Sequence, residues 1–125
     1  KMININNYNE DLSKIKQTDL VIFPEMFTTG FSMNPELYAE TMDGETIDWM
    51  KSWSTKLNAA ICGSLIIKEI YDSITRYYNR FVFVKPNGDV EHYDKIHLFS
   101  YCEENSHYNN GYKMKIINEW LDNMQ

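Results

Sequence analysis

The stretch that decides the fold reads Asp19-Leu-Val-Ile-Phe-Pro-Glu25-Met-Phe-Thr-Thr-Gly-Phe-Ser-Met33. Its first part, 19–23, is a run of apolar and β-branched residues that Pro24 stops. Such a run predicts a buried strand, because a strand with one wet face would alternate apolar and polar residues. The rest of the stretch reads as a loop at the carboxyl end of that strand.

Helices are expected on both sides of this strand. Tyr8, Leu12 and Ile15 recur at helical spacing near the N-terminus and predict a short helix. Asn34 suits an N-cap and Pro35 suits the first helical position, where no N–H is needed, so another helix is expected there. A longer helix is expected over 46–57, with one apolar stripe: Ile47, Met50, Trp53 and Leu57.

Further strands are expected in the second half of the chain. The segment 59–67 reads as a second buried strand and 76–85 as a third. Pro86-Asn87-Gly88-Asp89 predicts a turn into a strand over 90–96, so these last two strands should form a hairpin. The order of elements predicts an α/β chain with a mixed sheet.

The C-terminal third is harder to interpret. The segment 98–112 is polar and reads as a loop, and 114–120 is interpreted as another strand.

Composition narrows the class of protein. A chain of 125 residues fits one domain and buries about two-thirds of its unfolded surface. The net charge is −6 and the basic residues are scattered, which argues against nucleic acid as a partner. The apolar runs are too short to span a membrane. Two cysteines make no disulfide framework, so a cytoplasmic location is expected.

Glu25 is the first candidate for chemistry. It follows an apolar strand and precedes Met26 and Phe27. A partly desolvated carboxylate at the end of a strand suits a general base, and active sites of α/β sheets lie at such ends. A solvated glutamate on a turn fits its position equally well.

Lys95 and Glu104 are weaker candidates by themselves. Lys95 stands at the end of the predicted strand that begins at Val90, where a fixed cation would stabilise an oxyanion, although lysines at strand ends are usually just solvated. Glu104 stands beside Glu103 in a polar segment. Neighbouring acids in a polar segment are typical of a protein surface. Either carboxylate would also suit the role of holding Lys95 or a water molecule in position.

The cysteines and histidines give no clear site. Cys62 lies within a predicted strand and reads as a small buried hydrophobe, whereas Cys102 in the polar segment is open to reaction. The spacing of His97, Cys102, Glu103 and His107 matches no tight ligand pattern, so no metal is expected. The five glycines are dispersed and form no phosphate loop, so no cofactor is expected either.

Two long blocks nevertheless resemble one family. The stretch 19–33 is similar to the first catalytic block of the nitrilase superfamily of carbon–nitrogen hydrolases. Within it, the residues at positions 24–31 resemble those of the bacterial omega-amidase branch. Tyr78-Asn79-Arg80 and the segment 93–99 resemble the second block. The likeness continues to about Trp120 and covers nearly the whole chain.

The resemblance implies a four-layer α-β-β-α sandwich that usually dimerises, and a Glu-Lys-Cys triad without a cofactor. Glu25 would take the thiol proton and later activate water, Lys95 would steady the oxyanion, and Glu104 would organise the site. The implied substrates are small-molecule amides of 2-oxo acids, such as 2-oxoglutaramate and 2-oxosuccinamate. The residues expected to form the substrate pocket walls are Phe27, Phe31 and Met33.

The sequence departs from the family at both ends. The family's first strand has no counterpart before the first helix, and neither Cys62 nor Cys102 stands at the nucleophile's position. We therefore expect 1–125 to be a partial carbon–nitrogen hydrolase domain that is inactive as given, with the nucleophile in a Cys-Tyr-Asp-type motif beyond Gln125. The alternatives are a truncated, non-catalytic interaction module and another hydrolase of the superfamily, such as a carbamoylase.

Overall fold

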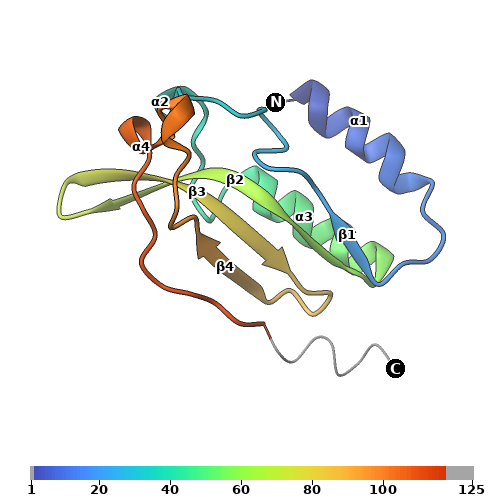
Figure 1. Cartoon of the computed structure of the whole chain (residues 1–125). Helices are drawn as coiled ribbons and strands as arrows, with labels where there is room; N and C mark the ends of the chain where they lie inside the picture. Colours follow the sequence, from blue (N-terminus) through green and yellow to red (C-terminus); the bar gives the residue numbers. More distant parts are fainter. Residues whose placement is uncertain (1, 118–125) are drawn as a thin grey trace.

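A computed structural model describes residues 2–117, which form a mixed α/β fold around one sheet (Figure 1). No helix within this range is long and apolar enough to cross a membrane. The elements in chain order are α1 (Met2–Ser13), β1 (Leu20–Ile22), α2 (Pro35–Tyr38), α3 (Glu45–Leu57), β2 (Ala60–Tyr71), β3 (Ile74–Val84), β4 (Val90–Asp94), the short 3-10 helix η1 (Ser100–Cys102) and α4 (Glu104–His107).

The sheet has the strand order β1-β2-β3-β4. β1 pairs parallel to β2, whereas β2–β3 and β3–β4 pair antiparallel, which confirms the predicted mixed sheet. The turn between β3 and β4 is also confirmed. Gly88 adopts a φ of 92°, in the region that favours glycine, and the N–H of Lys85 donates to the carbonyl of Asp89 at 2.9 Å.

The main core lies between α3 and one face of the sheet (Figure 1). Ile47 and Met50 of the predicted apolar stripe are buried there against Ile61, Leu65 and Val82. This packing confirms the third predicted helix, because burial of one apolar stripe supplies most of a helix's stability.

The first predicted helix is also confirmed, and polar bonds fasten it to α3. The side-chain oxygen of Asn9 accepts hydrogen bonds from the indole N–H groups of Trp49 at 2.7 Å and Trp53 at 2.9 Å. The hydroxyl of Tyr8 donates to the carbonyl of Phe27 at 3.1 Å. These contacts bring α1 against the segment that follows β1.

The prediction of a buried first strand is wrong. β1 has only three residues, and Ile22 is 71% exposed. Within the described residues β1 pairs with β2 alone, and most of the Ile22 side chain is left uncovered. The apolar run predicted the strand, but burial depends on which segments pack against it.

Three other expectations need correction. β2 and β3 are longer than predicted and are joined by a two-residue hairpin turn at Asp72 and Ser73, which both adopt positive φ. Asp-Ser is a weaker hairpin signal than Asn-Gly, so the sequence did not predict this turn. The predicted loop 98–112 contains η1 and α4. Of the predicted strand 114–120, residues 114–117 are not in a strand, and 118–120 lie outside the described residues.

Candidate active site

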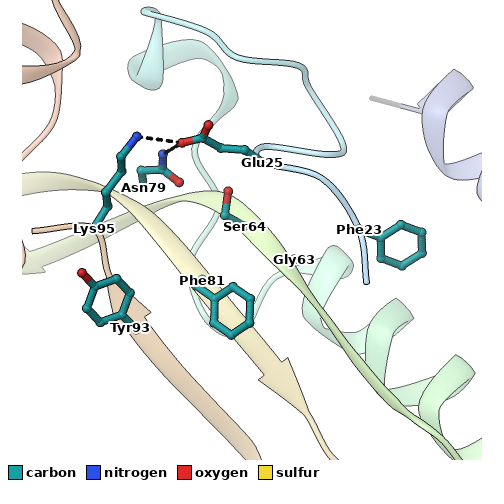
Figure 2. A pocket seen from close by; sticks show the side chains of 8 residues that line it. All are labelled: Phe23, Glu25, Gly63, Ser64, Asn79, Phe81, Tyr93 and Lys95. Atoms are coloured by element: carbon teal, nitrogen blue, oxygen red, sulfur yellow. Dashed lines mark hydrogen bonds and ion pairs between the residues drawn. The ribbon is translucent and has the colours of Figure 1, made fainter. Parts of the chain in front are cut away.

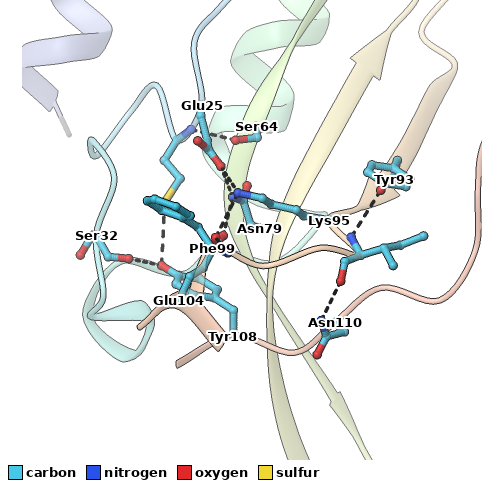
Figure 3. A network of polar contacts seen from close by, with 12 residues as sticks. Glu25, Ser32, Ser64, Asn79, Tyr93, Lys95, Phe99, Glu104, Tyr108 and Asn110 are labelled. Carbon is cyan, nitrogen blue, oxygen red and sulfur yellow. Dashed lines mark hydrogen bonds and ion pairs between the residues drawn. The ribbon is translucent and has the colours of Figure 1, made fainter. Parts of the chain in front are cut away.

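Three charged side chains that are distant in sequence meet at one end of the sheet (Figure 3). The ammonium nitrogen of Lys95 lies 2.9 Å from Oε1 of Glu25 and 3.0 Å from Oε2 of Glu104. Glu25 follows β1, Lys95 follows β4, and Glu104 begins α4. The structure therefore brings together all three residues that the sequence singled out for catalysis.

The loop carrying Glu25 is held against β2 by Ser64. The N–H of Met26 donates to the hydroxyl oxygen of Ser64 at 2.8 Å, and the N–H of Phe27 donates to its carbonyl at 3.3 Å. Met26 has a φ of 48°, so the chain turns sharply directly after Glu25. The Glu25 side chain remains 45% exposed, so the described chain shields it from water only in part.

Lys95 is held by backbone contacts on both sides. Its N–H donates to the carbonyl of Asn79 at 3.0 Å, and its own carbonyl accepts from the N–H of Gly111 at 3.0 Å. Residue 111 approaches so closely that a Cβ built there would lie 2.1 Å from the carbonyl oxygen of Asp94. Glycine is therefore required at this position by lack of space.

Gly111→Ala is expected to lower the free energy of unfolding by about 3 kcal/mol, since rigid backbone atoms would have to move to admit the methyl group. Urea unfolding measures the loss. Gly88→Ala is the matched control, because a Cβ there meets nothing within 4 Å. Only its positive φ disfavours alanine, which should lower the free energy of unfolding by about 1 to 2 kcal/mol. Equal losses in the two variants would contradict the steric argument.

Glu104 is fully buried, and its charge is compensated by donors. Its carboxylate accepts hydrogen bonds from the N–H of Phe99 at 2.7 Å and from the side-chain amide of Asn79 at 3.0 Å, besides the contact with Lys95. Burial by itself would raise the pKa of Glu104, but the donors outweigh it and hold the pKa below the ordinary value.

The pKa of Lys95 is shifted in the opposite direction. Burial would lower it, but the hydrogen bonds and charges of Glu25 and Glu104 outweigh burial and raise the pKa of Lys95 above its usual value. Lys95 is therefore a firmly charged cation at neutral pH, which suits stabilisation of an oxyanion rather than proton transfer.

A cavity of about 300 Å³ opens beside this cluster (Figure 2). Asn79, Ser64 and Tyr93 were not among the site residues predicted from the sequence, although Asn79 and Tyr93 lie in the segments that resemble the family's second block. The lining residues are Phe23, Glu25, Gly63, Ser64, Asn79, Phe81, Tyr93 and Lys95.

The three expected pocket-wall residues lie outside this cavity, and their role in binding substrate stays a prediction. Phe27 is 3% exposed and packs in the main core, stacked on Phe23 with ring centroids 4.5 Å apart. Met33 packs beside Met26 in a smaller cluster. Phe31 is nearer the charged cluster, with its ring centre 5.8 Å from the Lys95 nitrogen. None of the three lines the cavity formed by the described residues.

Neither cysteine lines the cavity. Cys62 is buried in β2, and burial raises the pKa of its thiol to about 11. Cys102 is exposed in η1. This agrees with the interpretation of Cys62 as a small buried hydrophobe.

Alkylation of the folded chain with iodoacetamide is expected to modify the exposed Cys102 at least about 100-fold faster than Cys62. Burial blocks access to Cys62 and raises the pKa of its thiol to about 11, so almost none of it is thiolate at neutral pH. Mass spectrometry of time points measures both rates. In urea the two thiols should react at similar rates. Comparable rates in the folded chain would contradict the burial of Cys62.

Comparison with known proteins identifies the family of the chain. The Carbon-nitrogen hydrolase family profile matches residues 2–117. The chain is 38% identical over 117 residues to the omega-amidase YafV of Yersinia enterocolitica and 35% identical to that of Escherichia coli K12. Both alignments cover 94% of this chain but only 43% of the relative, so the chain spans less than half of these enzymes' length.

Solved structures show the same relationship. A CN-hydrolase superfamily protein from Xanthomonas campestris, which has an arsenic adduct in its active site, superposes with a TM-score of 0.80 at 36% identity over 90% of this chain and 41% of its own. Saccharomyces cerevisiae Nit3, a nitrilase-superfamily member, shares the fold at a TM-score of 0.67 and 20% identity, over 90% of this chain and 44% of its own. The mixed sheet is thus part of the nitrilase fold, and the chain belongs to the carbon–nitrogen hydrolase family.

Proposed function

We propose that this chain supplies the glutamate and lysine of an omega-amidase active site. The enzyme would hydrolyse the omega-amide of 2-oxo acids, such as 2-oxoglutaramate and 2-oxosuccinamate, to the 2-oxo dicarboxylate and ammonia. The observation that carries the proposal is the contact of Lys95 with both Glu25 and Glu104 at the rim of a cavity. The similarity to bacterial omega-amidases supports the substrate class.

In the proposed mechanism Glu25 takes the proton from a cysteine thiol, and the thiolate attacks the amide carbon. Lys95 stabilises the negative charge that develops on the carbonyl oxygen. Glu25 then returns its proton to the departing ammonia, which leaves a thioester. Glu25 next takes a proton from water, whose oxygen attacks the thioester. The departing thiolate then takes that proton from Glu25, which releases the acid and restores the free thiol.

The nucleophile of this scheme is neither cysteine of the chain. Cys62 is buried, and Cys102 does not line the cavity. We propose that it follows Gln125 in a Cys-Tyr-Asp-type motif after one short strand. The coding sequence downstream of the Gln125 codon tests this directly, and a reading frame without any such motif would contradict it.

The proposed assembly follows from the family resemblance, and the proposed location follows from the lack of a disulfide framework. We propose a cytoplasmic homodimer, and sedimentation of the protein isolated from its source cells measures the mass of the assembly.

The activity is tested on the whole natural polypeptide that contains residues 1–125, as the source organism makes it. We expect it to release ammonia from 2-oxoglutaramate faster than it releases ammonia and carbon dioxide from N-carbamoyl amino acids. The reverse preference would replace the omega-amidase assignment with a carbamoylase. If the source organism makes a polypeptide of only 125 residues, and it folds but releases no ammonia from either substrate, the result would support the non-catalytic interaction module instead.

A further inference from the structure

Asn79 touches every member of the charged cluster, although the proposed mechanism gives it no role. It lies in β3, its side chain is 3% exposed, and its amide nitrogen is 2.6 Å from Oε1 of Glu25 and 3.0 Å from Oε1 of Glu104 (Figure 3). Its backbone carbonyl accepts the N–H of Lys95 at 3.0 Å. One residue thus contacts all three charged residues.

We propose that Asn79 is a positioning residue, which holds Glu25 and Glu104 on either side of Lys95 and determines which oxygen of Glu25 accepts the proton. This inference rests on the proposed function of Glu25 as the base. Asn79 itself neither takes nor gives a proton, because an amide is neutral at physiological pH.

Asn79 and Lys95 each donate hydrogen bonds to both carboxylates. Two carboxylates repel each other, and Lys95 supplies one positive charge to be shared between them. The amide of Asn79 has two N–H groups, and the two contacts to Glu25 and Glu104 use one each. Asn79 therefore forms a second bridge between the carboxylates, parallel to the bridge that Lys95 makes.

The two carboxylate oxygens of Glu25 differ in the hydrogen bonds that they accept. Oε1 accepts from both Asn79 and Lys95, whereas no described residue donates to Oε2 (Figure 2). A carboxylate oxygen that already accepts two hydrogen bonds has little lone-pair density left for a proton. Oε2 is therefore the oxygen that receives the proton in the proposed reaction.

Asn79 is held rigidly because its strand is paired with neighbours on both sides. Asn79 lies opposite Ile66 of β2, and the neighbouring Arg80 pairs with Asp94 of β4. Its backbone cannot shift without disturbing both pairings. The 45% exposed Glu25 side chain thus gains its orientation from a buried partner.

NMR spectroscopy on residues 1–125 tests the inference first, because it requires no catalytic turnover. Carbon-13 detection gives the carboxyl pKa of Glu104, which we expect to rise by about one unit in Asn79→Ala because one donor to the charged form is lost. Asn110→Ala is the matched control, since its side chain bonds to the carbonyl of Ile96 and should leave that pKa unchanged. An unchanged Glu104 pKa in a folded Asn79→Ala variant would overturn the proposal.

A wild-type measurement keeps the test decisive if that variant does not fold. The side-chain amide protons of Asn79 should shift with pH at the midpoint at which the Glu104 carboxyl titrates, because they bond to that group. Asn79 amide signals that stay constant through the Glu104 titration would contradict the bridge.

The consequence for catalysis is tested on a polypeptide with measured wild-type turnover. Asn79→Ala should lower kcat for 2-oxoglutaramate by about 10- to 100-fold and leave KM nearly unchanged, because a misdirected base transfers protons more slowly. Asn79→Asp, of equal size, should be slower still because it adds a third carboxylate. A wild-type kcat in Asn79→Ala would overturn the positioning role. Absence of turnover in the wild type would instead count against the proposed function, and the NMR result would still decide the bridge.

Discussion

Glu25→Gln is expected to lower kcat for ammonia release from 2-oxoglutaramate by about 10³-fold, within the range that removal of a general base produces. Glutamine has nearly the same shape and still offers a carbonyl oxygen to Lys95, so the fold should persist. What it lacks is a carboxylate to take a proton from the nucleophile and later from water. The measurement is steady-state kinetics on a polypeptide with demonstrated wild-type turnover.

The control for Glu25→Gln is Glu10→Gln on α1. Glu10 pairs with Lys14 at 3.4 Å, and both side chains are largely exposed. Its change removes a carboxylate of the same type outside the cavity, so kcat should remain as in the wild type. A Glu25→Gln enzyme within tenfold of wild type would remove Glu25 from the role of base.

Asp94→Ala is expected to lower the free energy of unfolding of residues 1–125 by about 3 to 5 kcal/mol, since it removes the partner of a buried charge. The guanidinium of Arg80, which is 2% exposed, donates to Asp94 through Nε at 2.7 Å and through Nη2 at 2.9 Å. Glu69 would remain as a partner of Nη2, at 2.7 Å, but its side chain is 50% exposed. Urea unfolding followed by circular dichroism measures the loss.

The geometry of Arg80 explains the size of that effect. Nη1 is already buried without a hydrogen-bond partner among the described residues. Burial would lower the pKa of Arg80, but bonds and charges from Asp94 and Glu69 outweigh it and raise that pKa, so the group stays charged whatever surrounds it. Loss of Asp94 would leave most of a buried cation without compensation.

A double variant separates this explanation from simple loss of packing. Arg80→Met combined with Asp94→Leu removes both charges and should recover most of the stability, because apolar side chains can replace a buried ion pair. Glu10→Ala, which breaks the exposed pair with Lys14, should change stability by at most about 0.5 kcal/mol. A loss below about 1 kcal/mol in Asp94→Ala would show that the Arg80 pair is weakly coupled to folding.

Local patterns predicted the parts of this fold that local physics controls. The apolar stripe of α3 and the Pro-Asn-Gly-Asp turn before β4 are encoded within a few residues, so spacing and turn chemistry were sufficient. The prediction for β1 was right in type and wrong in environment. An apolar run shows that a segment avoids water, whereas the exposure of Ile22 depends on which segments lie over it.

The sequence by itself determined the chemistry available and, through two family blocks, the identity of Glu25 and Lys95 as catalytic candidates. Only the tertiary structure decided how they meet. The contact of Asn79 with both carboxylates depends on the register of β3 between β2 and β4, and on α4 bringing Glu104 back to the sheet. Strand register joins residues that are distant in sequence, so spacing within any one segment carries no record of these contacts.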